Sequence, residues 1–195
     1  ANIRVSGPST VRGVVVRCDE ARDGIENMRG IRLRGGSDVV VENSRLVFDT
    51  VTSSDGAITC AEWLDAATIR NTHITVNADD VPAIWAKPPN GNRSKVRDHP
   101  IQIQSVRIDG SANSGAAVRI SERSDTLLSN LCICQHGDGR DGIAVSGADG
   151  TTVRGSAITV SGQPLATGGL SVRRDNLSPN STATNRSSCS CPKNR

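Results

Sequence analysis

Adjacent carboxylates and a histidine followed by glycine are the residues of this chain best suited to acid–base chemistry. Asp79 and Asp80 stand side by side, and His136-Gly137 is followed by charged residues, namely Asp138, Arg140 and Asp141. Paired carboxylates can supply the acid and the base of glycoside cleavage. This chemistry requires Asp79, Asp80 and His136 to meet in space, with basic residues nearby.

The same acidic residues allow a second kind of chemistry, the lyase reaction. Four aspartates can offer oxygen ligands to Ca²⁺, namely Asp79, Asp80, Asp138 and Asp141. Arg119 or Arg140 would then be the base that removes the proton next to a uronate carboxylate. The alternative is that acidic, glycine-rich turns simply recur at repeat boundaries, because Asp-Gly steps begin at Asp23, Asp55 and Asp141.

The elements that carry these residues follow a repeat. Six times, two aliphatic residues stand five positions apart: Val11/Val16, Val41/Leu46, Ile69/Ile74, Ile103/Ile108, Leu128/Ile133 and Val153/Ile158. The second position inside each pair holds a residue that tolerates a tight or left-handed backbone, namely Gly13, Asn43, Asn71, Ser105, Asn130 or Gly155. A unit that recurs every 25 to 34 residues around a fixed bend is typical of a solenoid.

A second apolar pattern precedes the pairs and continues beyond the last of them. Its members are Ile3/Val5, Ile31/Leu33, Ile58/Cys60, Ile84/Ala86, Val118/Ile120, Ile143/Val145 and Leu170/Val172. Alternation at period two indicates strands with one buried face. We therefore predict an all-β, parallel β-solenoid of about six to seven coils over residues 1–173, with an insertion loop at 87–99. Residues 174–195 are predicted to form an irregular tail rich in Ser, Thr and Asn.

This pattern resembles the right-handed parallel β-helix of the pectin-lyase-like superfamily, over roughly residues 3–172. Asn43, Asn71 and Asn130 stand at equivalent bends and are similar to that family's asparagine ladder, in which stacked amides bond one another. The alternative is that asparagine merely suits the turn.

The resemblance implies that any polysaccharide cleavage takes place on the outer face of the coils. Polygalacturonase-like members carry an Asp-Asp pair and a Gly-His-Gly motif, to which Asp79-Asp80 and His136-Gly137 are similar. Gln135 stands in place of the first glycine. The two motifs lie 56 residues and two coils apart, where the family expects about one coil.

Two outward-facing columns are candidates for binding a glycan or another anion. The first contains Arg45, His73 and Arg107, whose stacked positive charge would be satisfied by a uronate or sulfate, or by side chains that spread into water. The second contains Trp85 and Arg119. Trp85 can stack on a sugar ring or pack beneath the insertion loop that follows it.

Composition limits the classes of partner. The 195-residue chain has a net charge of only +3 and 2% aromatic residues, so it lacks the basic patch and stacking platforms of a nucleic-acid binder. No apolar run approaches the ~18 residues of a membrane span. We expect no cofactor, apart from Ca²⁺ under the lyase hypothesis. Ala1 suits a mature terminus after signal removal, and four sequons fit a secreted or cell-surface protein, at Asn92, Asn176, Asn180 and Asn185.

The six cysteines permit disulfides without fixing their pairing: Cys18, Cys60, Cys132, Cys134, Cys189 and Cys191. Cys132 and Cys134 alternate to one face of a strand, where residues at that spacing cannot easily bridge each other. Bridges between coils or between molecules remain open. A metal site is the less favoured interpretation, because zinc-binding cysteine pairs normally keep two to four residues between them.

Two functional hypotheses follow, and the first is a non-catalytic building block. Ile3-Arg4-Val5 enters the first coil with no amphipathic helix before it, so this edge is expected to pair with another copy and build a fibre. A tailspike or adhesin fragment fits the same pattern. The alternative is a lyase or polygalacturonase-like hydrolase, which the short chain and the scarcity of aromatic residues make the second choice.

Overall fold

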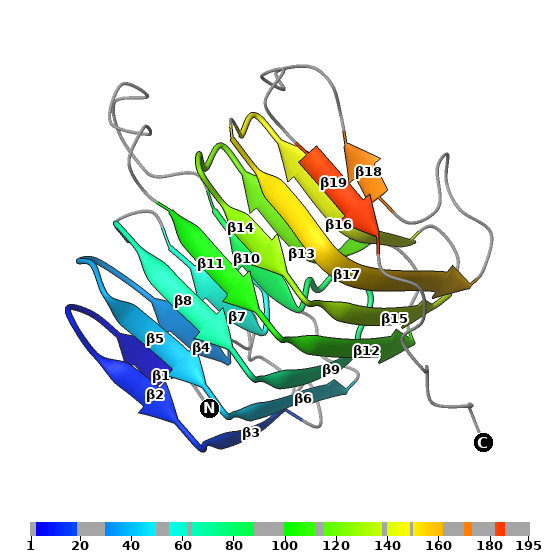
Figure 1. The fold of residues 1–195 in the computed structure, drawn as a ribbon. Coiled ribbons are helices and arrows are strands. Elements are labelled where there is room, and N and C mark those ends of the chain that lie inside the picture. The colour runs from blue at the N-terminus through cyan, green and yellow to red at the C-terminus, as the bar shows by residue number, and fades with distance from the viewer. Residues whose placement is uncertain are drawn as a thin grey trace.

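The fold is a stack of β-strand coils. The computed structural model describes residues 3–18, 30–49, 55–61, 64–87, 100–111, 115–137, 140–148, 150–161, 170–172 and 182–185. All regular structure in these ranges is β-strand. No helix among them is long and apolar enough to cross a membrane. Figure 1 shows the coils following one another along a single axis, from β1–β3 at one end to β17–β19 at the other.

The strands form three faces, which we name sheets A, B and C. Sheet A contains β1 (Ile3–Val5), β4 (Ile31–Leu33), β7 (Ile58–Cys60), β10 (Ile84–Ala86), β13 (Gly115–Ser121), β16 (Arg140–Ser146) and β18 (Leu170–Val172). Sheet B contains β2 (Thr10–Arg12), β5 (Val39–Glu42), β8 (Ala67–Arg70), β11 (Ile101–Gln104), β14 (Leu127–Ser129), the start of β17 (Thr152–Ser161) and β19 (Thr182–Asn185). Sheet C contains β3 (Val15–Cys18), β6 (Arg45–Asp49), β9 (His73–Asn77), β12 (Arg107–Ser111), β15 (Cys132–His136) and the end of β17.

Every strand pairing is parallel, as a solenoid requires. In sheet A, Ile58 pairs in register with Ile31 and with Ile84, and Val118 follows Ile84. All four side chains are completely buried. The predicted aliphatic columns are therefore confirmed, and with them the all-β solenoid.

The bends between sheets B and C adopt the backbone conformation predicted for them. The φ angles are +66° at Gly13, +50° at Asn43, +49° at Asn71, +52° at Ser105, +53° at Asn130 and +58° at Gly155. Each is left-handed, which glycine and asparagine adopt most readily. The backbone N–H of Asn43 donates to the carbonyl of Arg70 on the next coil, at 3.3 Å. The bend thus joins coils through its backbone, and the three asparagine side chains are exposed.

Two uncharged polar side chains, on β7 and β15, are completely buried. Thr59 stands between the inward-facing Ile58 and Cys60, so alternation predicts it on the outer face, yet it is buried and its hydroxyl accepts a hydrogen bond from the N–H of Gly56 at 3.1 Å. Gln135 points inward and is also completely buried. Its amide lies where a side chain on Gly110 would otherwise stand, since a Cβ there would come within 2.7 Å of Gln135 Oε1.

Two predicted segments fall largely outside the described residues. They are the insertion loop at 87–99 and most of the tail at 174–195. Within the tail, Thr182–Asn185 forms strand β19, which pairs with β17. A regular strand thus stands inside a region that we expected to be irregular.

A buried arginine joins the turns of three successive coils. Arg123, just after β13, is completely buried. Its Nη2 donates to the carbonyl of Ala61 at 2.7 Å, its Nη1 to that of Leu64 at 2.8 Å, and its Nε to that of Lys87 at 2.8 Å. Carbonyls that leave a sheet at a corner need such donors, because a buried acceptor without a partner is costly.

Candidate functional site

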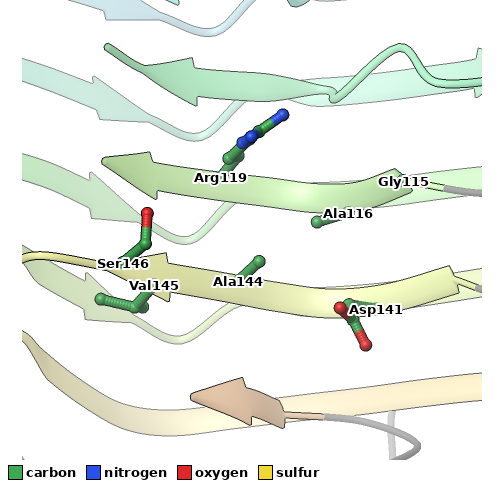
Figure 2. Close-up of a pocket in the computed structure, with 7 residues that line it drawn as sticks. All are labelled: Gly115, Ala116, Arg119, Asp141, Ala144, Val145 and Ser146. Carbon is green, nitrogen blue, oxygen red and sulfur yellow. The ribbon is translucent and has the colours of Figure 1, made fainter. Parts of the chain in front are cut away.

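An open hollow of about 300 Å³ lies on the outer face of sheet A, over β13 and β16. Its lining residues are Gly115, Ala116, Arg119, Asp141, Ala144, Val145 and Ser146. Most of these residues are small, and the two charged ones are Arg119 and Asp141. Figure 2 shows the Arg119 side chain extending from β13 away from β16, while the Asp141 side chain extends from β16 away from β13. The hollow therefore offers positive and negative charge at separate places.

Trp85 lies beside this hollow, since it pairs in register with Arg119. The Arg119 guanidinium carbon is 5.0 Å from the centre of the Trp85 ring, and Lys87 Nζ is 4.3 Å from it. Both distances are within the range of cation–π attraction. Trp85, which is half-buried, is thus already in contact with two cations of its own chain. A sugar ring would have to compete with them.

Lys87 is held from its other side by a buried carboxylate. Its ammonium forms an ion pair with Asp55, which is completely buried. A buried charge is tolerated only when it is paired, so this contact fixes the Lys87 ammonium between Asp55 and the Trp85 ring. The Asp55-Gly56 step therefore does more than form a turn.

The predicted basic column on sheet C contains its own counter-charge. Arg45, His73 and Arg107 stand on neighbouring strands in register, as predicted. Asp109 accepts two hydrogen bonds from Arg107, at 2.8 and 3.1 Å, and lies 2.7 Å from His73 Nε2. This carboxylate is largely buried, with 16% of its side chain exposed. The charge of the column is thus met in part inside the protein, and Arg45 remains exposed.

A second carboxylate bridges three coils on sheet B. Glu42 is paired in register with Arg12 and Arg70, and its side chain is 4% exposed. Arg70 donates to Oε2 at 2.7 Å, and Arg12 donates to Oε1. Hydrogen bonds from Arg70 and then from Arg12 hold the pKa of the Glu42 carboxyl below its usual 4.5. The cluster links three coils through charge.

Glu42 should make folding stability depend on pH. Because its folded-state pKa is lowered, its contribution is fully present above the ordinary value of 4.5 and is lost as the pH falls through the folded-state value. We expect Glu42→Gln to lower the free energy of unfolding at pH 7, and the difference from wild type to shrink steadily below pH 4.5. Urea unfolding of both proteins from pH 7 to pH 3 measures this. A difference that stayed the same across the series would contradict the role of the ion pair.

The residues proposed for hydrolysis do not meet. Asp79 and Asp80 are exposed and follow β9, while His136 ends β15 and contacts Ser161 Oγ through Nδ1, at 2.6 Å. Asn77, at the end of β9, bonds to Ser111, and Ser111 pairs with His136. His136 is therefore two strands from the end of β9, or about 10 Å at the usual strand spacing. The predicted separation of two coils is confirmed.

The lyase arrangement is described only in part. Asp138 and the side chain of Arg140 lie outside the described residues. Asp141 and Arg119 share the hollow on sheet A, but Asp79 and Asp80 are not among its lining residues. Within the described ranges, no three His, Cys, Asp or Glu side chains are grouped as a metal ion would require.

The cysteines divide into two classes. Cys132 and Cys134 are disulfide-bonded, whereas Cys18 and Cys60 are buried and lie outside any disulfide. Burial raises the pKa of the Cys60 thiol to about 11, against the opposing effect of the Arg123 charge. Cys60 is thus a core residue kept in its unreactive form. Cys189 and Cys191 lie outside the described residues, as do the sequons at Asn92, Asn176 and Asn180, while Asn185 is the last residue of β19.

Sequence reasoning missed the acidic partners of the basic residues. Glu42 and Asp109 were not singled out, although each lies in a strand whose register was predicted. A signal was present, since Asp109 stands two positions after Arg107 on the same face of one strand. The role of Asp55 as an ion-pair partner could not be predicted, because it depends on the direction that the Lys87 side chain takes.

Taken together, the fold and its outer faces define the class as an all-β, parallel β-solenoid with charged clusters that bridge its coils. No family model, no curated protein and no solved structure matches the chain.

Proposed function

We propose that this chain is a secreted, non-catalytic β-solenoid, a structural or surface building block that associates with further copies of itself through its first coil. The observation that carries the proposal is the position of β1, β2 and β3 at the ends of their sheets. Each of these strands ends its sheet in the strand order, so one edge of each has no partner among the described residues. Unpaired edges of this kind are templates for another chain.

Incompletely buried apolar side chains at the same coil support the proposal. Val15 on β3 is 72% exposed, and no other large hydrophobic side chain in the described ranges is exposed. The half-buried residues that pack against the core also lie in the end coils: Ile3, Val11 and Val14 in the first, and Ile158 in the last described one. A second copy stacked on this edge would cover Val15 and complete the burial of Ile3 and Val11.

Two lysine substitutions test the proposal. We expect the average mass of the wild-type chain to rise with concentration in sedimentation and light-scattering experiments. Val15→Lys places a charge on the edge strand and should shift the rise to concentrations at least about tenfold higher. Gln102→Lys is the matched control, because Gln102 is exposed on β11, a strand that is paired on both sides. A wild-type protein that stays monomeric throughout, or an equal effect of both variants, would exclude the first coil as the interface.

Binding of an acidic glycan on the outer face is a second candidate, favoured by the hollow beside Arg119. With this function we also propose that the solenoid is a right-handed β-helix of the pectin-lyase-like superfamily. Arg119→Gln should weaken retention on immobilised polygalacturonate, and Arg154→Gln, at an exposed position on β17, should not. Release of unsaturated or reducing ends by the wild-type protein, abolished by Asp80→Asn or His136→Ala, would instead favour the enzyme.

A further inference from the structure

We propose that a second hollow, between Arg4 and Arg34, binds a tetrahedral dianion, the group shared by inorganic phosphate, inorganic sulfate and phosphate monoesters. This hollow measures about 410 Å³ and is lined by Arg4, Val5, Ser6, Arg34 and Gly35. It lies at the junction of β1 and the segment that follows β4. It is separate from the hollow beside Arg119, which lies over β13 and β16.

Backbone hydrogen bonds hold the two arginines on adjacent coils. The N–H of Arg34 donates to the carbonyl of Val5 at 2.7 Å, and the N–H of Gly7 donates to that of Gly35 at 3.0 Å. Arg4 stands next to Val5 and therefore one coil away from Arg34. Both arginine side chains are exposed. The positions are thus fixed by the sheet, while the guanidinium groups are open to a ligand.

The lack of an acidic partner distinguishes this pair from the other paired cations of the solenoid. Arg12 and Arg70 share Glu42, His73 and Arg107 share Asp109, and Lys87 is paired with Asp55. Among the described residues, neither Arg4 nor Arg34 forms an ion pair.

Like charges held on adjacent strands repel unless an anion lies against them. In the Glu42 and Asp109 clusters a carboxylate does so, and between Arg4 and Arg34 a hollow takes its place. The geometry therefore leaves room for an anion from outside.

The size and lining of the hollow indicate the kind of ligand. Two guanidinium groups match a doubly charged group in charge, and their planar forks suit its oxygen atoms. The Ser6 hydroxyl adds a further donor. A volume of about 410 Å³ lies within the range of small-molecule sites, so it accommodates a phosphate together with a small organic group.

The test is a titration of the full chain at constant ionic strength. Inorganic phosphate, inorganic sulfate and glycerol phosphate are each exchanged against sodium chloride, and binding is followed by calorimetry and by amide NMR shifts. We expect saturable binding, with shifts at Ser6 and Gly35. Arg34→Gln should weaken it by about tenfold or more, as the loss of a charge-assisted contact requires. Arg34→Lys should weaken it less, and Arg154→Gln should leave it unchanged.

Several outcomes would overturn the proposal. Shifts that never saturate, or that chloride produces equally, would mean charge screening alone. Equal affinity of wild type, Arg4→Gln and Arg34→Gln would exclude the hollow.

The order of affinities identifies the ligand that the hollow prefers. A preference for glycerol phosphate over both inorganic ions would assign the site to an organic ester, and the reverse order would assign it to a free ion. Arg34→Gln leaves the edge strand β1 itself unchanged, so sedimentation of this variant shows whether self-association is retained when anion binding is lost.

Discussion

Arg123→Met is expected to lower the free energy of unfolding by about 3 to 5 kcal/mol, which is a large share of the stability of a domain of this size. Methionine fills much of the space of the arginine stem, so the change removes hydrogen-bond donors more than it opens a cavity. The loss then falls on the carbonyls of Leu64 and Lys87, whereas the carbonyl of Ala61 keeps the 3.2 Å hydrogen bond that it accepts from the N–H of Leu64. Each buried acceptor without a partner costs about 1 to 3 kcal/mol.

The experiment compares urea unfolding of wild type, Arg123→Met, Arg123→Lys and Arg154→Met. Arg154 is exposed on β17, so its replacement should change stability by less than about 0.5 kcal/mol. Lysine keeps the charge but not the planar fork, so it can reach fewer of the three carbonyls and should restore only part of the loss. An Arg123→Met protein as stable as the Arg154→Met control would show that the carbonyls find other donors.

The register of the solenoid could be predicted because it depends on local patterns that repeat. The five-residue spacing around Gly13, Asn43 and their equivalents marks a left-handed bend, and the backbone places such a bend there in every coil. Once the bends are aligned, strand alternation decides which residue faces the core. This is why the two neighbours of Ile58 in sheet A were predicted correctly, although each lies about 27 residues away in the chain.

The contacts at the charged clusters could not be predicted in the same way. Arg123 follows a strand at a corner, where alternation no longer decides direction, and its three acceptors belong to two other turns. Trp85 and Arg119 were predicted as neighbours, but the second cation on the ring comes from Lys87, whose direction depends on Asp55. The same limit applied to Gln135, which occupies space left by Gly110 on the neighbouring strand.

The one phenylalanine of the chain has a similar dependence on a glycine. Phe48 is completely buried in sheet C. A Cβ built on Gly30 would lie 2.8 Å from the Phe48 ring and 2.3 Å from the carbonyl oxygen of Ala57. That oxygen accepts the 2.9 Å hydrogen bond from the N–H of Ile31 that begins the pairing of β4 with β7. Because the φ angle of Gly30 is not left-handed, an alanine there tests space alone.

We therefore expect Phe48→Ala to lower the free energy of unfolding by about 3 to 5 kcal/mol, because it opens a cavity in a core built mainly from small aliphatic residues. Gly30→Ala should lower it by about 1 to 3 kcal/mol through overpacking. In the double variant the added methyl group enters the space left by the ring, but it still meets the Ala57 carbonyl. Its loss should then be smaller than the sum of the single losses by about 1 kcal/mol. Urea unfolding of the four proteins measures this coupling, and strict additivity would mean that the Ala57 carbonyl alone requires glycine at position 30.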